Sequence, residues 1–250
     1  MFPTITLLVT HYNRSQSLQH LLQTFADQEV QFGDIVVSDD GSKAEHLNKL
    51  VELQSIYDFR LVIAPKNAGL GNNINKGQDA VTTPYTLYVQ EDFEPVPFYG
   101  QHLKDALAIM DELPAIDIVR FYAYFKYPYL KPFRKGFSEM KFNIWYPGYR
   151  KFHAYSDHPH LRRSSFLQKF GRYAEGIKGD ATEFGMTISF LKKKGRGMFY
   201  EDYKGLFNQV NTFVEPSTMI RSDVRQSNNP FIALPRAIYR NIVHTLKVLF

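Results

Sequence analysis

The feature that most constrains the fold is an alternation, along residues 5–89, between short apolar runs and segments suited to amphipathic helices. The apolar runs lie at 5–10, 35–38, 59–64 and 86–89. The helical segments begin at Ser15 and occupy 44–57 and 70–81. Short, β-branched apolar runs predict buried strands. Helices between consecutive strands predict an α/β fold with a mostly parallel central sheet flanked by helices.

The sequence also predicts the residue that caps the first helical segment. Its apolar residues recur at helical spacing, at Leu18, Leu21, Leu22 and Phe25. Ser15 stands just before them, and a serine hydroxyl is a common acceptor for the free backbone N–H groups of a first helical turn. The sequence therefore predicts Ser15 as the cap of this helix.

Polar residues follow each predicted strand. They are Thr10-His11-Tyr12-Asn13, Asp39-Asp40, Lys66-Asn67 and Gln90-Glu91-Asp92. Because the carboxyl ends of parallel strands meet at one edge of a sheet, where α/β folds bind ligands, we expect these side chains to form a site there.

The second half of the chain has a different composition. Residues 121–155 hold 14 aromatic residues, seven Lys or Arg and a single acid, Glu139. Aromatic faces stack on sugar rings and Arg or Lys hold anionic groups, so the basic aromatic segment 121–163 is expected to cross the sheet edge and shape an acceptor site. Packing of these aromatics in the core is the alternative. Residues 166–195 return to helical spacing and end at Gly195, after three lysines.

Charge is distributed unevenly. Residues 1–110 hold 7 Lys or Arg and 13 Asp or Glu, a net −6, and the remaining 23 basic and 12 acidic residues give 111–250 a net +11. A basic half can attract nucleic acid, anionic lipid or an acidic acceptor, or simply form a solvated face. The chain has no cysteine, which excludes disulfides and thiolate metal sites and fits a reducing compartment.

The two ends of the sequence indicate how the protein could contact a membrane. No basic segment precedes the apolar run at Ile5, so no secretory signal is expected, and no run of about 18 apolar residues predicts a span. The C-terminal segment 235–250 is amphipathic, with Ile238, Ile242, Leu246 and Leu249 on one stripe and its cations elsewhere. Such a helix either packs on its own domain or lies on an anionic membrane.

Four blocks, taken in order, resemble family-2 glycosyltransferases of the GT-A fold. They are Thr10-x-Tyr12-Asn13-Arg14, Asp39-Asp40-Gly41-Ser42, Asn67-x-Gly69-x-Gly71 followed by Asn75-x-x-Gln78, and Gln90-Glu91-Asp92. The likeness covers about residues 4–110 well and 175–200 weakly. It implies a nucleotide-sugar-binding half at 1–110, an acceptor and catalytic-base half of the same domain at 111–234, and a C-terminal helix at 235–250.

The resemblance assigns donor-binding residues. In that family the first loop and the Asp-Asp-Gly-Ser loop hold the nucleotide base. Asp39 would accept the N–H of the base, Tyr12 would stack on its ring and Thr10 would add a contact. The glycine loop would lie beside the phosphates, and Glu91 would contact the ribose. The implied donor-binding set is Thr10, Tyr12, Asn13, Arg14, Asp39, Asp40, Asn67, Gly69 and Glu91.

The same resemblance implies a divalent cation, Mn²⁺ or Mg²⁺, on Asp92. A hard cation prefers carboxylate oxygens and neutralises the charge that builds on a leaving diphosphate. Gln90 replaces the first acid of the family's three-residue pattern, and the stretch 207–211 lacks the late histidine that many relatives supply. A histidine group, His153, His158 and His160, is better explained as core or surface histidines than as a metal site, and Arg162-Arg163 faces either an acceptor or solvent.

Inverting transfer needs a carboxylate that takes the acceptor's hydroxyl proton. The resemblance places this base in a Glu-Asp pair about a dozen residues before Gly195. That position is Glu183, but Phe184 stands where its partner would be. Glu183 is therefore the first choice and Asp180 the second. The alternative is that Glu183 is only an acid favoured by the helix dipole.

Together these features predict a glycosyltransferase that moves a sugar, with inversion, from a nucleotide-diphosphate donor to a glycan or lipid-linked acceptor in surface polysaccharide or glycolipid synthesis. It is expected in the cytoplasm, with possible contact at the inner face of the membrane and no nucleic-acid partner. A non-catalytic nucleotide- or sugar-binding relative stays open. A nucleotidyltransferase is disfavoured because the first loop, 11–14, contains no glycine.

Overall fold

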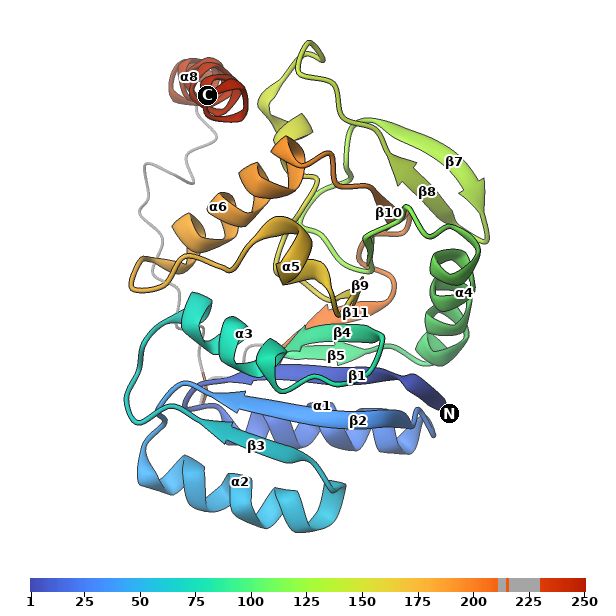
Figure 1. Ribbon diagram of the computed structural model, residues 1–250, viewed down its shortest axis with the longest axis vertical. Coiled ribbons are helices and arrows are strands. Elements are labelled where there is room, and N and C mark those ends of the chain that lie inside the picture. Colours follow the sequence, from blue (N-terminus) through green and yellow to red (C-terminus); the bar gives the residue numbers. More distant parts are fainter. Residues whose placement is uncertain (211–214, 216–229) are drawn as a thin grey trace.

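The computed structural model describes residues 1–210, 215 and 230–250, and its main feature is one large sheet with helices on both faces (Figure 1). The helices are α1 (Ser15–Asp27), α2 (Ala44–Tyr57), α3 (Leu70–Asp79), α4 (Tyr99–Glu112), the 3-10 turn η1 (Tyr149–Phe152), α5 (Phe166–Phe170), α6 (Gly179–Lys192) and α8 (Pro230–Leu249). The strands are β1 (Phe2–His11), β2 (Phe32–Asp39), β3 (Arg60–Ile63), β4 (Tyr85–Gln90), β5 (Phe93–Pro95), β6 (Ile118–Arg120), β7 (Leu130–Arg134), β8 (Phe137–Met140), β9 (His160–Arg163), β10 (Gly197–Tyr200) and β11 (Phe207–Gln209).

The nine-stranded sheet has the order β3-β2-β1-β4-β9-β6-β10-β8-β7. β1 to β4 pair in parallel, as the alternation predicts. β9 then enters antiparallel between β4 and β6, and β7 and β8 add an antiparallel hairpin. The α/β prediction is confirmed, but the sheet is mixed, because the second half contributes returning strands without crossover helices.

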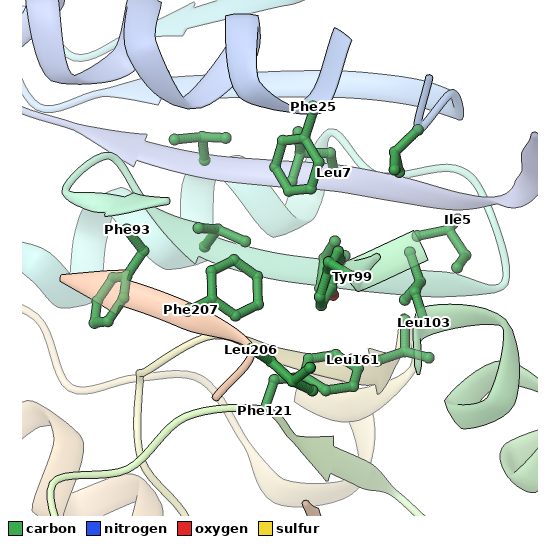
Figure 2. Close-up of a cluster of buried hydrophobic side chains, with 14 of the residues drawn as sticks. Ile5, Leu7, Phe25, Phe93, Tyr99, Leu103, Phe121, Leu161, Leu206 and Phe207 are labelled. Atoms are coloured by element: carbon green, nitrogen blue, oxygen red, sulfur yellow. The ribbon is translucent and has the colours of Figure 1, made fainter. Parts of the chain in front are cut away.

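Both faces of the sheet are buried at β1, which is why this strand carries apolar side chains on both faces. Along β1, Leu7 and Val9 face a core shared with α1 and α4, while Leu8 faces a second core shared with α3, α5 and α6. Figure 2 shows the first core, where Phe25 of α1 and Tyr99 of α4 pack with Phe121 and Phe207.

The register brings the predicted polar residues to one edge. Thr10 of β1 lies opposite Ser38 of β2 and Gln90 of β4, and His11 lies opposite Asp39. The carboxyl ends of these strands therefore meet, because parallel strands with matched registers end together.

Six of the 14 aromatic residues of the segment 121–155 form core. The buried aromatics within it are Phe121, Tyr122, Tyr127, Phe137, Phe152 and Tyr155. Tyr124, Phe133 and Trp145 are exposed. For the six buried rings the core alternative is correct, since rings of this size stabilise the sheet more when they are desolvated.

Two local predictions need correction. The helical spacing over 166–195 is split into α5 and α6, because Gly171 and Gly176 adopt positive φ angles of 90° and 70° between them. Ser15 does not cap α1: its hydroxyl pairs with His46 at 2.9 Å. The carboxylate of Glu215 accepts instead from the backbone N–H groups of Gln16 and Ser17 at 3.0 and 2.8 Å.

Candidate functional site

Asp39 and His11 form the centre of the sheet-edge loops. His11 Nδ1 lies 2.7 Å from Asp39 Oδ1, and the backbone N–H of Arg14 donates to His11 Nε2, which leaves Nδ1 as the donor to Asp39. Ser42 donates to the same carboxylate from its backbone at 2.9 Å and its hydroxyl at 2.5 Å. Burial by itself would raise the pKa of Asp39, but the hydrogen bonds from His11 and Ser42 outweigh it and lower that pKa.

The Asp39 carboxylate is fully buried in this arrangement, so it shapes the loop that would hold a nucleotide. A direct contact between Asp39 and a base would have to replace one of its hydrogen bonds. The Thr10 hydroxyl also has a hydrogen-bond partner within the protein, the Tyr88 hydroxyl at 3.0 Å. Tyr12 is half-buried at the same edge. The base-binding roles of Asp39, Thr10 and Tyr12 stay predictions.

Asn13 joins the first loop to the second. It has a left-handed φ of 54°, its backbone N–H donates to the Ser42 hydroxyl at 2.8 Å, and its side-chain oxygen accepts from the backbone of Lys43 at 2.8 Å. Asparagine tolerates this backbone region better than most residues. The two predicted donor loops therefore form one hydrogen-bonded unit.

Asp40 connects this unit to the glycine loop. Its two carboxylate oxygens accept from the backbone N–H groups of Ala68 and Gly69, each at 2.9 Å. Gly69 precedes α3 with a φ of 89°, which favours glycine, and Asn67 beside it is exposed. Burial raises the pKa of Asp40 despite these hydrogen bonds. Asp40 thus positions the glycine loop. Of the two predicted donor-binding residues in that loop, Asn67 is exposed and Gly69 is half-buried.

Arg14 and the two acids after β4 form a charged cluster. The Arg14 guanidinium lies 3.3 Å from Asp92 and 3.9 Å from Glu91, and all three side chains are almost fully buried. Burial and the neighbouring charge of Asp92 raise the pKa of Glu91 to about 8. Glu91 and Asp92 also line a pocket of about 220 Å³ beside the first turn of α1. The structure therefore brings together three of the predicted donor and metal residues.

The late strand β11 closes this cluster. Gln209 donates from its side-chain amide to Asp92 at 3.0 Å, and the backbone N–H of Val210 donates to the Asp92 carbonyl at 2.7 Å. The Arg14 guanidinium also donates to the carbonyls of Val210 and Glu215. Gln209 thus lies beside Asp92, in the stretch where the sequence lacked a histidine.

Glu183 belongs to a second acidic group, which it shares with Asp157. The two carboxyl groups are hydrogen-bonded; Asp157 is buried and Glu183 is half-buried. Burial raises the pKa of Asp157 to about 6, and burial together with the Asp157 charge raises the pKa of Glu183 well above its usual value. Two neighbouring carboxyl groups resist ionising together, so the charge of one raises the pKa of the other.

Gln90 and Arg120 surround this pair. Gln90 donates from its amide to Asp157 at 3.2 Å, which explains why an amide replaces the family's acid there: a third carboxylate beside Asp157 and Glu183 would be repelled. Arg120 is buried and donates to the carbonyl of His153 and the hydroxyl of Ser156. Burial lowers the pKa of Arg120 to about 10, and the charge of Glu183 partly opposes this change.

The structure also separates the two candidates for the base. Asp180 is exposed on the first turn of α6, whereas Glu183 lies about one turn further, half-buried and paired with Asp157. Phe184, which stands in place of the family's aspartate, packs against His244 of α8 with ring centroids 4.2 Å apart. Asp157 was missed from the sequence. Its one signal was its position as the sole acid between Glu139 and Glu175.

The other polar residues singled out from the sequence have structural partners. His160 is fully buried, with Nδ1 2.7 Å from the carbonyl of His158, and burial lowers its pKa. Arg162 donates to Gln78 and to the Tyr173 hydroxyl inside the core. Arg162 therefore faces neither an acceptor nor solvent, and a buried guanidinium of this kind is held by its hydrogen bonds.

The residues around Asp92 fit a divalent cation. Asp92 and Glu91 offer carboxylate oxygens, and the amide of Gln209 offers a further oxygen if it rotates. Mg²⁺ and similar cations are commonly held by one or two carboxylates and by substrate phosphates. Within the described residues no group of three or more His, Cys, Asp or Glu could hold a metal. A donor diphosphate would therefore have to complete the ligand set.

This mixed α/β fold, with acidic residues at the carboxyl edge of its parallel strands, is of the GT-A type. Residues 6–171, about two thirds of the chain, match the family described as Glycosyl transferase family 2, and the chain belongs to that family. The family assignment and the fold expected from the four sequence blocks are thereby confirmed.

Solved structures agree on the fold. Crystal structures of S. aureus TarS 1-349, alone and in complex with UDP-GlcNAc, align with TM-scores of 0.62 and 0.63 at 20% and 18% identity, covering 82% and 88% of this chain and 59% and 62% of that one. A mannosyltransferase from Pyrobaculum calidifontis, in complex with GDP-Man and Mn²⁺, aligns with a TM-score of 0.57 at 13% identity, over 81% of this chain and 56% of that one.

Curated relatives are similar over shorter stretches. A poly-beta-1,6-N-acetyl-D-glucosamine synthase of Staphylococcus epidermidis is 26% identical over 98 residues, and a teichoic acid poly(glycerol phosphate) polymerase of that species is 26% identical over 92. The alignments cover 38% and 36% of this chain. They span only 24% and 13% of the length of those relatives.

Proposed function

We propose that this protein transfers a sugar from a nucleoside diphosphate donor to an acceptor hydroxyl, with inversion, in the synthesis of a surface polysaccharide or glycolipid. Family membership supports the reaction class. Similar solved structures include complexes with UDP-GlcNAc, UDP and GDP-Man, which supports a nucleotide-sugar donor.

One observation carries the proposal: the hydrogen bond between Gln90 and Asp157 at 3.2 Å. It joins the donor-side acids that follow β4 to the carboxyl pair of Asp157 and Glu183. The charge of Asp92 also contributes to the raised pKa of Asp157, so the two acidic groups act within one site. A displacement reaction needs a leaving-group site and a base on either side of one sugar carbon, and two linked acidic groups supply both.

The carboxyl pair supplies the base. In the proposed step the acceptor oxygen forms a bond to the anomeric carbon, the bond from that carbon to the diphosphate breaks, and the hydroxyl proton passes to Glu183. Asp157 holds Glu183 in place by their hydrogen bond and raises its proton affinity. A base of raised pKa is a stronger proton acceptor once its own proton has left.

The donor is held by the other group. Asp39, Asp40 and Asn13 organise the loops proposed to bind the nucleotide, and Arg14 provides a fixed positive charge near the diphosphate. A divalent cation, Mn²⁺ or Mg²⁺, would be held by Asp92, with Glu91 and Gln209 nearby. When bound, it would neutralise charge on the leaving diphosphate.

The acceptor is proposed to be a glycan or a lipid-linked glycan on the cytoplasmic side of a membrane, without nucleic acid as a partner. The exposed Tyr124 supports a sugar acceptor, because its ring stands at the edge of the site and its hydroxyl donates to Gln209 at 3.2 Å. An aromatic ring in that place suits the apolar face of a sugar.

The proposal is tested by incubating the protein with UDP- and GDP-linked sugars, with and without Mn²⁺, and measuring released nucleoside diphosphate and glycosylated acceptor. We expect release from at least one donor. A second candidate, a non-catalytic nucleotide-binding relative, rests on Gln90 and Phe184. It would be favoured if a nucleoside diphosphate raised the melting temperature while every donor stayed intact.

A further inference from the structure

The C-terminal helix α8 turns its apolar side away from the protein. Ile238, Ile242 and Leu246 have exposed fractions of 53%, 55% and 49%. The exposed apolar residues of this end of the chain are Leu234, Ile238, Tyr239, Ile242, Leu246, Leu249 and Phe250. At 100° per residue they cover one continuous arc of the helix, which we call the α8 apolar face. The sequence alternative in which this stripe packs on the domain is therefore wrong.

The opposite side of α8 contacts the protein through His244, Arg240 and Lys247, together with the apolar Val248. His244 packs on Phe152 and Phe184, and burial lowers its pKa to about 4, so the ring is neutral. The Arg240 guanidinium lies over the ring of Tyr149 at 5.5 Å, and the Lys247 ammonium lies over Phe184 at 5.1 Å. Cation–π contacts therefore hold the helix with its apolar residues outward.

Charge identifies what covers this face. α8 contains three cationic residues, Arg236, Arg240 and Lys247, and no Asp or Glu. A helix with an apolar face, cations on its other side and no acid matches the chemistry of an anionic lipid surface. We propose that α8 lies on an anionic membrane, with its apolar face in the boundary between headgroups and acyl chains.

Two other arrangements fit less well. Among the described residues no helix is long and apolar enough to cross a bilayer, so α8 would rest on the membrane surface. A second copy of the chain is disfavoured by area. Twenty residues make a helix about 30 Å long, and an arc about 10 Å wide offers about 300 Å². A stable interface buries about 800 Å² per partner.

Binding of α8 to a membrane would also place Glu183 near lipid. The catalytic importance of this position rests on the proposed function. Phe184, which packs on His244 of α8, directly follows Glu183. A helix is about 10 Å wide, so a membrane on the outer side of α8 would lie roughly one helix diameter beyond Phe184. Figure 1 shows α8 beside α6, at the end of the molecule opposite α2.

The test is co-sedimentation of the purified protein with vesicles of phosphatidylcholine alone or with 30% phosphatidylglycerol. We expect binding to the anionic vesicles, weaker at high salt, and little binding to the neutral ones. The triple variant Ile238→Ser/Ile242→Ser/Leu246→Ser should bind more than about tenfold more weakly. Because these side chains are exposed, its melting temperature should match that of the parent.

The matched control is Val51→Ser/Ile56→Ser on α2, whose side chains are 61% and 65% exposed. This variant should bind vesicles like the parent. Equal binding by the triple variant and the parent would overturn the proposal, as would a dimer in light scattering that the triple variant abolishes. Donor hydrolysis without vesicles should be unchanged in the triple variant, so loss of docking is distinguished from failure of the catalytic proposal.

Discussion

The carboxyl group of Glu183 in α6 is hydrogen-bonded to that of Asp157, which precedes β9 by three residues. Phe184 takes the place of the acid that the family carries beside its base. Asp157 supplies a second carboxyl from another part of the chain. Glu183 therefore still has a second carboxyl group beside it, although Phe184 replaces the family's acid. That carboxyl belongs to Asp157, which is distant in the sequence and reaches Glu183 through the tertiary fold.

We expect Glu183→Gln to lower turnover by at least about 100-fold, since loss of a positioned general base typically costs that much or more. Binding of a nucleoside diphosphate, measured by thermal shift, should stay close to that of the parent. Asp180→Asn is the control, because Asp180 is exposed, and it should keep nearly full turnover. The reverse result would assign the base to Asp180.

Asp157→Asn should move the pH dependence of turnover to lower pH. Glu183 is active when deprotonated, so activity is present above its pKa and is lost as the pH falls through it. After burial, the charge of Asp157 is the largest cause that raises the pKa of Glu183, and the variant removes that charge. The measurement is kcat from about pH 5 to 9. A rising limb that stays in place or moves upward would show that Asp157 does not act on the base.

Asp92→Ala should abolish any gain in melting temperature that Mn²⁺ adds in the presence of a nucleoside diphosphate. Such a gain reports binding to the folded state, and Asp92 is a carboxylate that contacts both Arg14 and Gln209. Asp92→Asn should give the same result with less disturbance of these neighbours. An undiminished Mn²⁺ effect in both variants would place the cation elsewhere.

Gly41→Ala should destabilise the fold by about 1–3 kcal/mol. Gly41 has a φ of 70°, and an added Cβ would lie 2.4 Å from the backbone of Lys66. Gly185, inside α6, meets nothing within 4 Å, so Gly185→Ala should instead stabilise by up to about 1 kcal/mol. Urea unfolding would measure both, and equal effects of the two substitutions would count against the close contact at Gly41.

Local pattern predicted much of the fold. The helix expected at 44–57 is α2, and all four expected strands are present within a few residues. The edge where Arg14, Glu91 and Asp92 meet was also predictable, because parallel strands place their ends together. These features depend on side chains a few positions apart along the chain.

The sequence by itself determined the alternation of strands and helices, the donor-side acids and the amphipathic character of the last helix. Only the tertiary structure decided that Asp157 meets Glu183, that Glu215 rather than Ser15 caps α1, and that the α8 apolar face points outward. The physical reason is the separation along the sequence of the residues that interact. Hydrophobic periodicity is a property of neighbouring residues, whereas a contact between distant polar groups depends on where the intervening chain returns.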